Sequence, residues 1–247
     1  MLQQTLRFLS SLPKEFCEEY MKKEIFDRLY KEDYSTGVIV YWQEIDERIK
    51  FLWQTTGLKA LSLLKDIVTC INSKNYFPAL ISTRALLENV AVLHFCLCKI
   101  DIAYAKIVKT DILGKIERKE ISGVVVSKEL EDLLIKYSHG TTLKELIKIQ
   151  DKWKQTRISK YVKFLSRDEN FRKASDYYSL LCQVAHPSFG SIQIFYYGGN
   201  VVNGKEIHCF GTKQSLDFFL KIASYPLNIS CEILADEIPK LRNIKFI

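Results

Sequence analysis

Long segments of this sequence carry apolar residues at helical spacing and contain few residues that break helices. Residues 38–73 and 76–98 repeat apolar side chains every three to four positions, as one buried face of a helix requires. The chain of 247 residues contains only 10 Gly and 5 Pro, so turns are few and long helices are favoured. The pattern therefore predicts a mainly α-helical protein, built as a multi-helix bundle.

One segment departs from the helical pattern. Residues 191–197 combine β-branched and aromatic side chains, and Asn203 and Gly204 follow just before a second apolar run. Asn-Gly between apolar runs is a strong signal for a tight hairpin turn. We therefore expect a small C-terminal β-hairpin over about 191–210. It must pack against helices, because two strands alone are only marginally stable.

The remaining sequence fixes the expected domain organisation. A final amphipathic helix is expected over residues 213–236, kinked or interrupted at Pro226. The sequence shows no internal repeat, no low-complexity tract and no long linker. We therefore predict one helical domain over residues 38–247, preceded by an N-terminal helical extension over residues 1–37.

The composition indicates a soluble protein of a reducing compartment. A hydrophobic fraction of 47% and a charged fraction of 26% are ordinary for a globular chain. The first residues lack the basic start and long apolar run of a signal peptide, and no apolar run reaches the length of a membrane span. The seven cysteines are odd in number and lie mostly in apolar helical context, which is typical of reduced, buried thiols. We therefore expect a cytoplasmic protein that does not act at a membrane.

Arg84 and Glu88 interrupt the most apolar predicted helix. They lie four positions apart, which places them on one helix face and allows them to pair. Two interpretations remain open. In the first, they form a buried structural ion pair that fixes helix packing. In the second, Arg84 binds a phosphate or another anion and Glu88 holds it in place.

His186 ends another apolar predicted helix, next to Pro187. A His at this position either interacts with the helix dipole or acts as a general acid or base near neutral pH. Tyr178 lies about two turns earlier and is expected to face the same groove. No nucleophile elbow of the G-x-S-x-G kind accompanies these residues, so Ser-His-Asp catalysis is not supported.

Residues 152–173 are rich in basic and aromatic side chains, in a chain whose net charge is +7. Such a stretch is either a solvated helix face or a nucleic-acid surface, on which Lys and Arg meet phosphates and aromatic rings stack on bases. The candidate nucleic-acid-binding residues are Lys152, Trp153, Lys154, Arg157, Lys160, Tyr161, Lys163 and Arg167.

No motif for a metal or cofactor is present. H-E-x-x-H, C-x-x-C, Walker and G-x-G-x-x-G patterns are all missing. Cys96 and Cys98 are two positions apart on a predicted helix, so they point in different directions and argue against a metal clip. His94, His139 and His208 are interpreted as structural or surface histidines. We therefore expect neither a metal nor a cofactor.

Two short motifs on the predicted helices resemble a known group of proteins. Arg-x-Leu-x-Glu on one helix is followed, well downstream, by Tyr-x2-Leu and then His-Pro. The residues are Arg84, Leu86, Glu88, Tyr178, Leu181, His186 and Pro187. This combination resembles an uncharacterised family of bacterial helical proteins related to the HEPN superfamily, over roughly residues 40–235 by the order of elements.

The resemblance implies an α-helical bundle and an action on RNA. Many HEPN proteins are metal-independent RNases of toxin–antitoxin, phage-defence and CRISPR systems, and others are non-catalytic partners that bind RNA or nucleotides. HEPN RNases usually carry Arg and His on one helix with four to six residues between them, whereas Arg84 precedes His94 by ten residues. A catalytic pair must therefore be assembled across helices, from Arg84 and His186. A homodimer is implied by the resemblance alone.

Two hypotheses follow. In the first, the protein is a metal-independent RNA-cleaving or RNA-acting toxin or antiphage effector. His186 would be the general acid or base, Arg84 would stabilise the phosphate, Glu88 would orient Arg84 and Tyr178 would assist. In the second, the protein is a non-catalytic sensor, or a protein- or RNA-binding module of a defence system, in which the same residues form a packing network.

Overall fold

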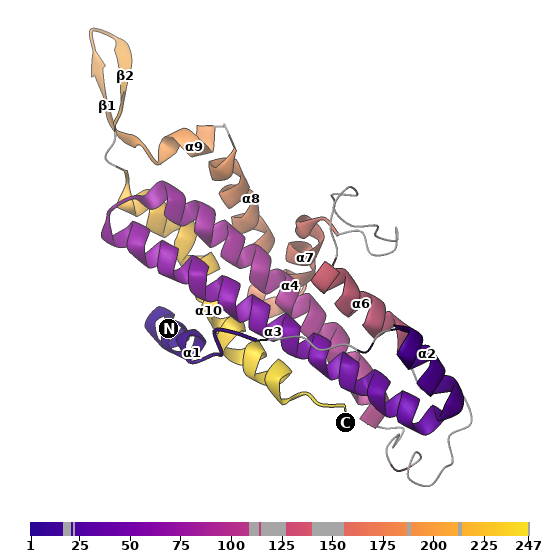
Figure 1. Ribbon diagram of the computed structural model, residues 1–247. Coiled ribbons are helices and arrows are strands. Elements are labelled where there is room, and N and C mark those ends of the chain that lie inside the picture. The colour runs from indigo at the N-terminus through magenta and orange to yellow at the C-terminus, as the bar shows by residue number, and fades with distance from the viewer. Residues whose placement is uncertain are drawn as a thin grey trace. The chain divides into compact units, whose positions relative to one another are not determined.

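The structure is a computed structural model that is mainly helical, with one small antiparallel sheet (Figure 1). It describes residues 1–16, 21, 23–108, 114, 127–139, 156–186, 189–211 and 214–246. The described elements are α1 (Leu2–Ser10), α2 (Lys23–Glu32), α3 (Tyr34–Asn72), α4 (Tyr76–Val108), α6 (Lys128–His139), α7 (Ile158–Leu165), η2 (Glu169–Phe171), α8 (Ala174–Ala185), α9 (Phe189–Gln193), β1 (Tyr196–Val202), β2 (Lys205–Phe210) and α10 (Leu216–Asn243). The predicted fold class, a helical protein with a C-terminal hairpin and a final helix, is confirmed.

The chain forms two compact units that do not follow the order of the sequence. Unit 1 consists of Met1–Leu12, Thr56–Val92 and Ile158–Asp236. Unit 2 consists of Pro13–Thr55, Leu93–Arg157 and Glu237–Ile247. The helices α3, α4 and α10 each contribute residues to both units. The predicted boundary between an extension and a domain at residue 37 stays a prediction.

Unit 1 is held by apolar faces of α3, α4, α8 and α10. Leu64 of α3 and Leu86 and Leu87 of α4 are fully buried. The rings of Tyr76 and Phe219 stack with their centroids 5.4 Å apart, joining the start of α4 to α10. Since burial of one large apolar side chain stabilises a fold by about 1.5–3 kcal/mol, these faces hold the helices that carry the candidate site.

Unit 2 has its own core along the first half of α3. Ile45, Ile49 and Leu52 follow one another at helical spacing and are almost completely buried. The ring of Phe246 stacks on Trp42 at 4.8 Å between centroids. The backbone N–H of Phe246 also donates to the carboxylate of Asp46, at 3.0 Å from Oδ1. The segment after α10 is thereby fixed to α3.

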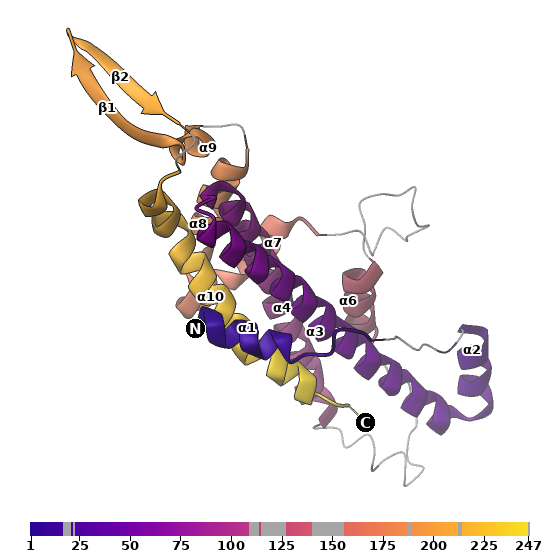
Figure 2. The same ribbon diagram turned by 60° about the vertical axis from the view of Figure 1, so that its left-hand side comes forward.

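The β-hairpin of unit 1 extends away from the helices in both views (Figures 1 and 2), and five of the six residues of β2 are exposed, so the expectation that it packs against helices is wrong. Its turn is the predicted one: Asn203 and Gly204 have φ angles of 52° and 72°, which only Gly and a few polar residues adopt readily. Tyr196 is half-buried, and its hydroxyl would lie 2.9 Å from a Cβ atom at Gly199. The backbone carbonyl oxygen of Ile207 would lie at the same 2.9 Å, and because this atom cannot move aside easily, the strand needs glycine at position 199.

The first strand begins later than the sequence predicts. Strand β1 starts at Tyr196, whereas residues 191–193, expected as strand, belong to α9. Ile194 is fully buried, and its carbonyl accepts a hydrogen bond from the backbone of Ser215 at 2.9 Å. This tertiary contact uses the backbone just ahead of the strand, and it overrides the local β-propensity.

Other expectations meet mixed outcomes. Pro226 lies inside α10 without interrupting it, since the helix runs from Leu216 to Asn243. The described cysteines are unpaired as expected, but only Cys96 and Cys231 are buried and four are half-exposed. Cys17 lies outside the described residues. In the part of the chain that the structure describes, no helix has the length and apolarity that crossing a membrane requires.

Candidate functional site

Arg84, Glu88 and Tyr178 form a polar cluster in unit 1. The Nε atom of Arg84 donates to Oε1 of Glu88 at 3.0 Å, within one turn of α4. The hydroxyl of Tyr178, on α8, donates to the same Glu88 oxygen at 3.2 Å. The guanidinium carbon of Arg84 lies 5.7 Å from the centre of the Tyr178 ring, within cation–π range. The pairing predicted from the spacing of Arg84 and Glu88 is therefore present, and Tyr178 joins it from a second helix.

The surrounding sequence explains why the cluster lies where it does. Leu86 and Leu87 anchor this part of α4 in the core, and Leu181 anchors α8 in the same unit. Residues three and four positions apart share a helix face, so Arg84 and Glu88 lie together beside the buried positions. About 25% of each of their side chains remains exposed. The cluster is therefore a half-open site and not a sealed ion pair.

The electrostatics keep Arg84 charged and Tyr178 neutral. Burial alone would lower the pKa of Arg84, but the contact with Tyr178 and the charge of Glu88 outweigh it and raise that pKa. Burial, the hydrogen bond with Cys182 and the charge of Glu88 raise the pKa of Tyr178 to about 12. At neutral pH the cluster thus presents a fixed guanidinium, whose remaining N–H groups are donors suited to an anionic oxygen, while the Tyr178 hydroxyl is already engaged with Glu88.

His186 is not part of this cluster in the described structure. It is exposed, caps the C-terminal end of α8, and donates its backbone N–H to the carbonyl of Cys182 at 3.1 Å. Eight residues separate it from Tyr178, which is about 12 Å of rise along a helix. No contact between His186 and Arg84 or Glu88 is found among the described residues. The described structure thus shows no contact that joins Arg84 and His186, and their composite catalytic pair stays a prediction.

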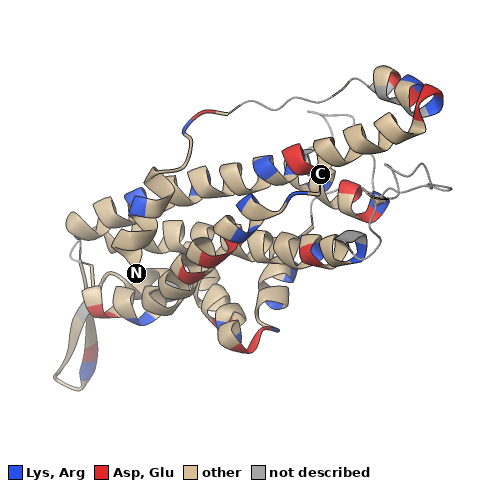
Figure 3. Ribbon diagram, turned by 90° about the horizontal axis from the view of Figure 1, so that it is seen from below, with Lys and Arg blue, Asp and Glu red and all other residues tan. Residues whose placement is uncertain are grey.

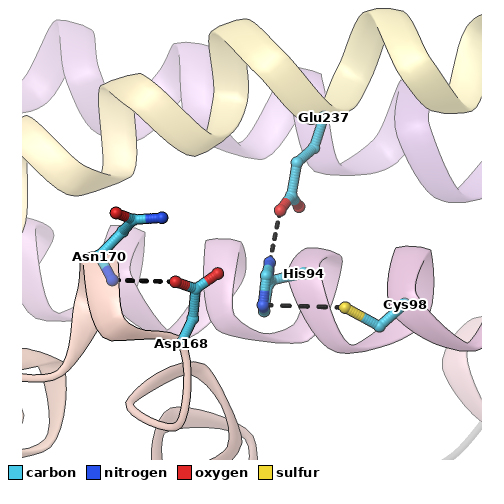
Figure 4. Close-up of polar contacts among 5 residues, drawn as sticks. All are labelled: His94, Cys98, Asp168, Asn170 and Glu237. Carbon is cyan, nitrogen blue, oxygen red and sulfur yellow. Dashed lines mark hydrogen bonds and ion pairs between the residues drawn. The ribbon is translucent and has the colours of Figure 1, made fainter.

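Part of the basic-aromatic stretch lies on α7 and the turn after it. Acidic and basic residues are otherwise interspersed along the described helices (Figure 3). Helix α7 buries Val162 and Leu165 and leaves Lys160 and Lys163 exposed. After α7, the carboxylate of Asp168 accepts from the backbone N–H of Asn170 at 2.9 Å and starts η2 (Figure 4).

The other predicted nucleic-acid-binding residues fall in different places. Arg167 is exposed, with its guanidinium carbon 5.9 Å from the centre of the Phe164 ring, and Tyr161 is half-buried. Arg157 is exposed and belongs to unit 2. Lys152, Trp153 and Lys154 lie outside the described residues.

Unit 2 contains a second polar cluster, which the sequence analysis did not predict. Nδ1 of His94 lies 2.5 Å from Oε1 of Glu237, which reaches it from α10 (Figure 4). Nε2 of the same ring lies 3.8 Å from the sulfur of Cys98, one turn further along α4 (Figure 4). The imidazole therefore bridges a carboxylate and a thiol. Exposed fractions of 11% for His94 and 6% for Glu237 show that this cluster is buried.

The charges of this cluster are strongly coupled. Burial alone would lower the pKa of His94, but the hydrogen bonds with Cys98 and Glu237 and the negative charge of Glu237 raise it to about 10. His94 is therefore an imidazolium at neutral pH, with both ring nitrogens as donors. Burial and the charges of Cys98 and Glu237 raise the pKa of neighbouring Cys96 to about 12, so Cys96 remains a thiol.

One half of this cluster had a sequence signal and the other half had none. His94 and Cys98 are four positions apart in an apolar helix, the same spacing that identified Arg84 and Glu88. Glu237 lies 143 residues from His94, and only the folded chain joins them. Within the described residues, no group of three His, Cys, Asp or Glu side chains is arranged to hold a metal ion.

Unit 2 also contains a cleft of about 520 Å³ between α3 and the end of α10. Trp53 and Lys50 line it from α3, and Arg242 and Lys245 line it from the C-terminal side. None of the predicted site residues that the structure describes lines it.

Comparisons with protein-family models, with curated proteins and with solved structures gave no significant match.

Proposed function

We propose that the protein binds RNA through the Arg84 cluster of unit 1 and does not cleave it, so that unit 1 acts as an RNA-binding helical module. The observation that carries this proposal is a charged Arg84 that is held by Glu88 and Tyr178 while a quarter of its side chain stays exposed. An arginine whose rotamer is already fixed loses less conformational freedom when it binds a phosphate.

Charge and aromatic content support RNA as the anion. The net charge of +7 favours polyanions in general. Lys160 and Lys163 are exposed on α7, which packs against the helix that carries Tyr178. Phosphate contacts by such lysines supply sequence-independent affinity, and half-buried aromatic rings near them provide stacking surfaces for unpaired bases.

RNA cleavage is the second candidate, and the position of His186 decides against placing it first. A general acid or base and the group that stabilises the phosphate must each reach the same reacting atoms within about 3 Å. His186 follows Tyr178 by about 12 Å of helix rise. The exposure of His186 and the HEPN resemblance are what support cleavage. A toxin or defence role, a protein partner and a homodimer remain parts of this second proposal.

The test is a binding titration of a fluorescently labelled single-stranded RNA, followed by anisotropy, with Arg84→Ala compared with wild type. Loss of a hydrogen bond to a charged partner costs about 1.5–3 kcal/mol, so we expect the Kd to rise about tenfold or more. Lys65→Ala is the matched control, because it removes one exposed charge of the same unit without touching the cluster. Equal affinities of wild type and Arg84→Ala would refute the proposal.

The same samples distinguish binding from cleavage. Total RNA and a tRNA pool are incubated with wild type and with His186→Ala in EDTA. We expect intact RNA in both. Cleavage by wild type that is lost in a folded His186→Ala protein would replace the binding proposal with the metal-independent RNase.

A further inference from the structure

Cys98 is half-exposed, and among the described cysteines it is the one whose sulfur is recorded in contact with an imidazole ring. His94 presents Nε2 to that sulfur at 3.8 Å and Nδ1 to the Glu237 carboxylate at 2.5 Å. Nucleophile, base and orienting carboxylate follow one another in the order that activates cysteine and serine nucleophiles. A purely structural pair of His94 and Glu237 would not require a thiol at the second ring nitrogen.

The geometry points to Cys98 as a nucleophile that reduces hydroperoxides, with His94 as its proton donor and Glu237 as the residue that positions His94. An imidazolium next to sulfur stabilises the thiolate form, which is the nucleophile in cysteine chemistry. The raised pKa of His94, which burial opposes and its bonds with Cys98 and Glu237 produce, supplies that imidazolium at neutral pH. The inference does not depend on the RNA proposal, which concerns unit 1.

The surroundings of the thiol favour this chemistry over acyl transfer. Cys98 lies inside α4, where backbone N–H groups are used by the helix, and acyl transfer needs free donors to form an oxyanion hole. Its neighbour Leu97 is buried, and Cys98 itself is half-exposed. A small reagent such as a hydroperoxide therefore reaches the sulfur more easily than a bulky acyl substrate. Peroxide reduction needs only a thiolate and a proton for the departing oxygen.

The reaction balances with the sulfur of Cys98, the proton on His94 and one hydroperoxide. The Cys98 thiolate attacks the terminal oxygen of a hydroperoxide, an S–O bond forms, and the O–O bond breaks. Sulfur is oxidised by two electrons to sulfenic acid, which is the first and reversible step of cysteine oxidation. The peroxide is reduced, and its departing oxygen takes the proton from Nε2 of His94, leaving an alcohol, or water when hydrogen peroxide is the oxidant. His94 then remains neutral and bonded to Glu237.

The experiment compares cysteines within one sample of the full chain. Wild-type protein is treated separately with iodoacetamide and with hydrogen peroxide plus dimedone, and modification is followed at each cysteine by mass spectrometry. Cys70 is the internal control, because it is also half-exposed and its thiol contacts no histidine in the described structure. We expect Cys98 to react about tenfold faster than Cys70, since only Cys98 has the imidazole ring of His94 beside its sulfur among the described contacts. Equal rates would overturn the proposal.

Glu237→Gln tests the positioning role without removing the side chain's volume. We expect the ratio of Cys98 to Cys70 reactivity to fall about tenfold, because His94 loses the carboxylate that keeps it charged and aligned. If Glu237 has only a structural role, the ratio of Cys98 to Cys70 reactivity should rise in the variant. A loosened core would then expose Cys98 and raise its rate of modification. An unchanged or increased ratio in the variant would therefore overturn the assignment, and so would the failure of dimedone to trap a sulfenic acid at wild-type Cys98.

Discussion

Arg84 and His94 lie ten positions apart on α4, and each is paired with a glutamate, yet the two pairs differ in almost every other respect. A quarter of the Arg84 and Glu88 side chains is exposed, whereas His94 and Glu237 are almost completely excluded from solvent. The partner of Arg84 is local in sequence, and that of His94 comes from α10. The comparison teaches that two ion pairs on one helix can differ widely in burial, and under the two proposals this difference separates a pair that binds a ligand from a pair that positions a thiol.

The largest expected difference between the two pairs is in stability. His94→Leu leaves the Glu237 charge buried without its imidazolium, and removal of one partner of a buried pair costs about 3–5 kcal/mol. Arg84→Leu removes a half-exposed pair and should cost about 1 kcal/mol or less. Urea unfolding followed by circular dichroism gives both free energies. Equal losses in the two variants would show that the pairs do not differ in burial as described.

A smaller but more specific difference is expected in pH dependence. The pKa of His94 rises from its ordinary 6.5 to about 10 in the folded chain, where burial is outweighed by Cys98 and Glu237. Its contribution to stability is therefore fully present below pH 6.5 and is lost as the pH rises through about 10. The raised pKa of Arg84 lies above this window, so Arg84 contributes no change there.

The measurement is the free energy of unfolding at pH 6, 8 and 10 for wild type and His94→Gln. The gap between the two proteins should shrink steadily with rising pH, because Gln has no proton to lose. The neighbouring Cys96, with a pKa of about 12, stays protonated through most of the window. A gap that is constant from pH 6 to pH 10 would contradict the assignment of a charged His94.

The Tyr178 hydroxyl should contribute less. Tyr178→Phe removes its hydrogen bond to Glu88, and a single bond of this kind is worth about 1 kcal/mol. Tyr177→Phe is the matched control, since that neighbouring ring stacks on Tyr225 at 4.8 Å and the stacking does not need the hydroxyl. The midpoint of thermal unfolding should be lower for Tyr178→Phe than for wild type and Tyr177→Phe. Identical midpoints would mean that the hydroxyl contributes nothing to the cluster.

The smallest effect concerns salt. If Arg84 neutralises one RNA phosphate, Arg84→Ala should reduce the slope of log K against log salt concentration by about 0.7, the value for a single strand. The same titration with His94→Gln should leave the slope unchanged, because that residue faces the interior. A slope that changes equally in both variants would indicate a general effect on folding and not a phosphate contact.

Periodicity was sufficient to predict the helices, because α3 and α4 repeat apolar residues over many turns and contain few breakers. The hairpin followed from Asn203 and Gly204, whose backbone angles only a few residues adopt. The first residue of β1 could not be predicted from the sequence. Ile194 is buried through a backbone contact with Ser215, and that contact has no trace in local propensity.

Only part of the candidate site could be predicted from the sequence. The spacing of Arg84 and Glu88 predicted their pairing because four residues make about one helical turn. The site that needs Glu237 could not be predicted, because 143 residues separate it from His94 and the intervening chain gives no register. The catalytic role of His186 stays a prediction, since no contact with Arg84 is found in the described residues.

The division into two units has an optical consequence. All three tryptophans of the chain, Trp42, Trp53 and Trp153, fall within the residue ranges of unit 2, and unit 1 contains none. Tryptophan emission during unfolding therefore follows unit 2 alone, whereas far-ultraviolet dichroism follows the helices of both units. Coincident transitions by the two signals would show that the units melt as one cooperative body, and separate transitions would assign a stability to each.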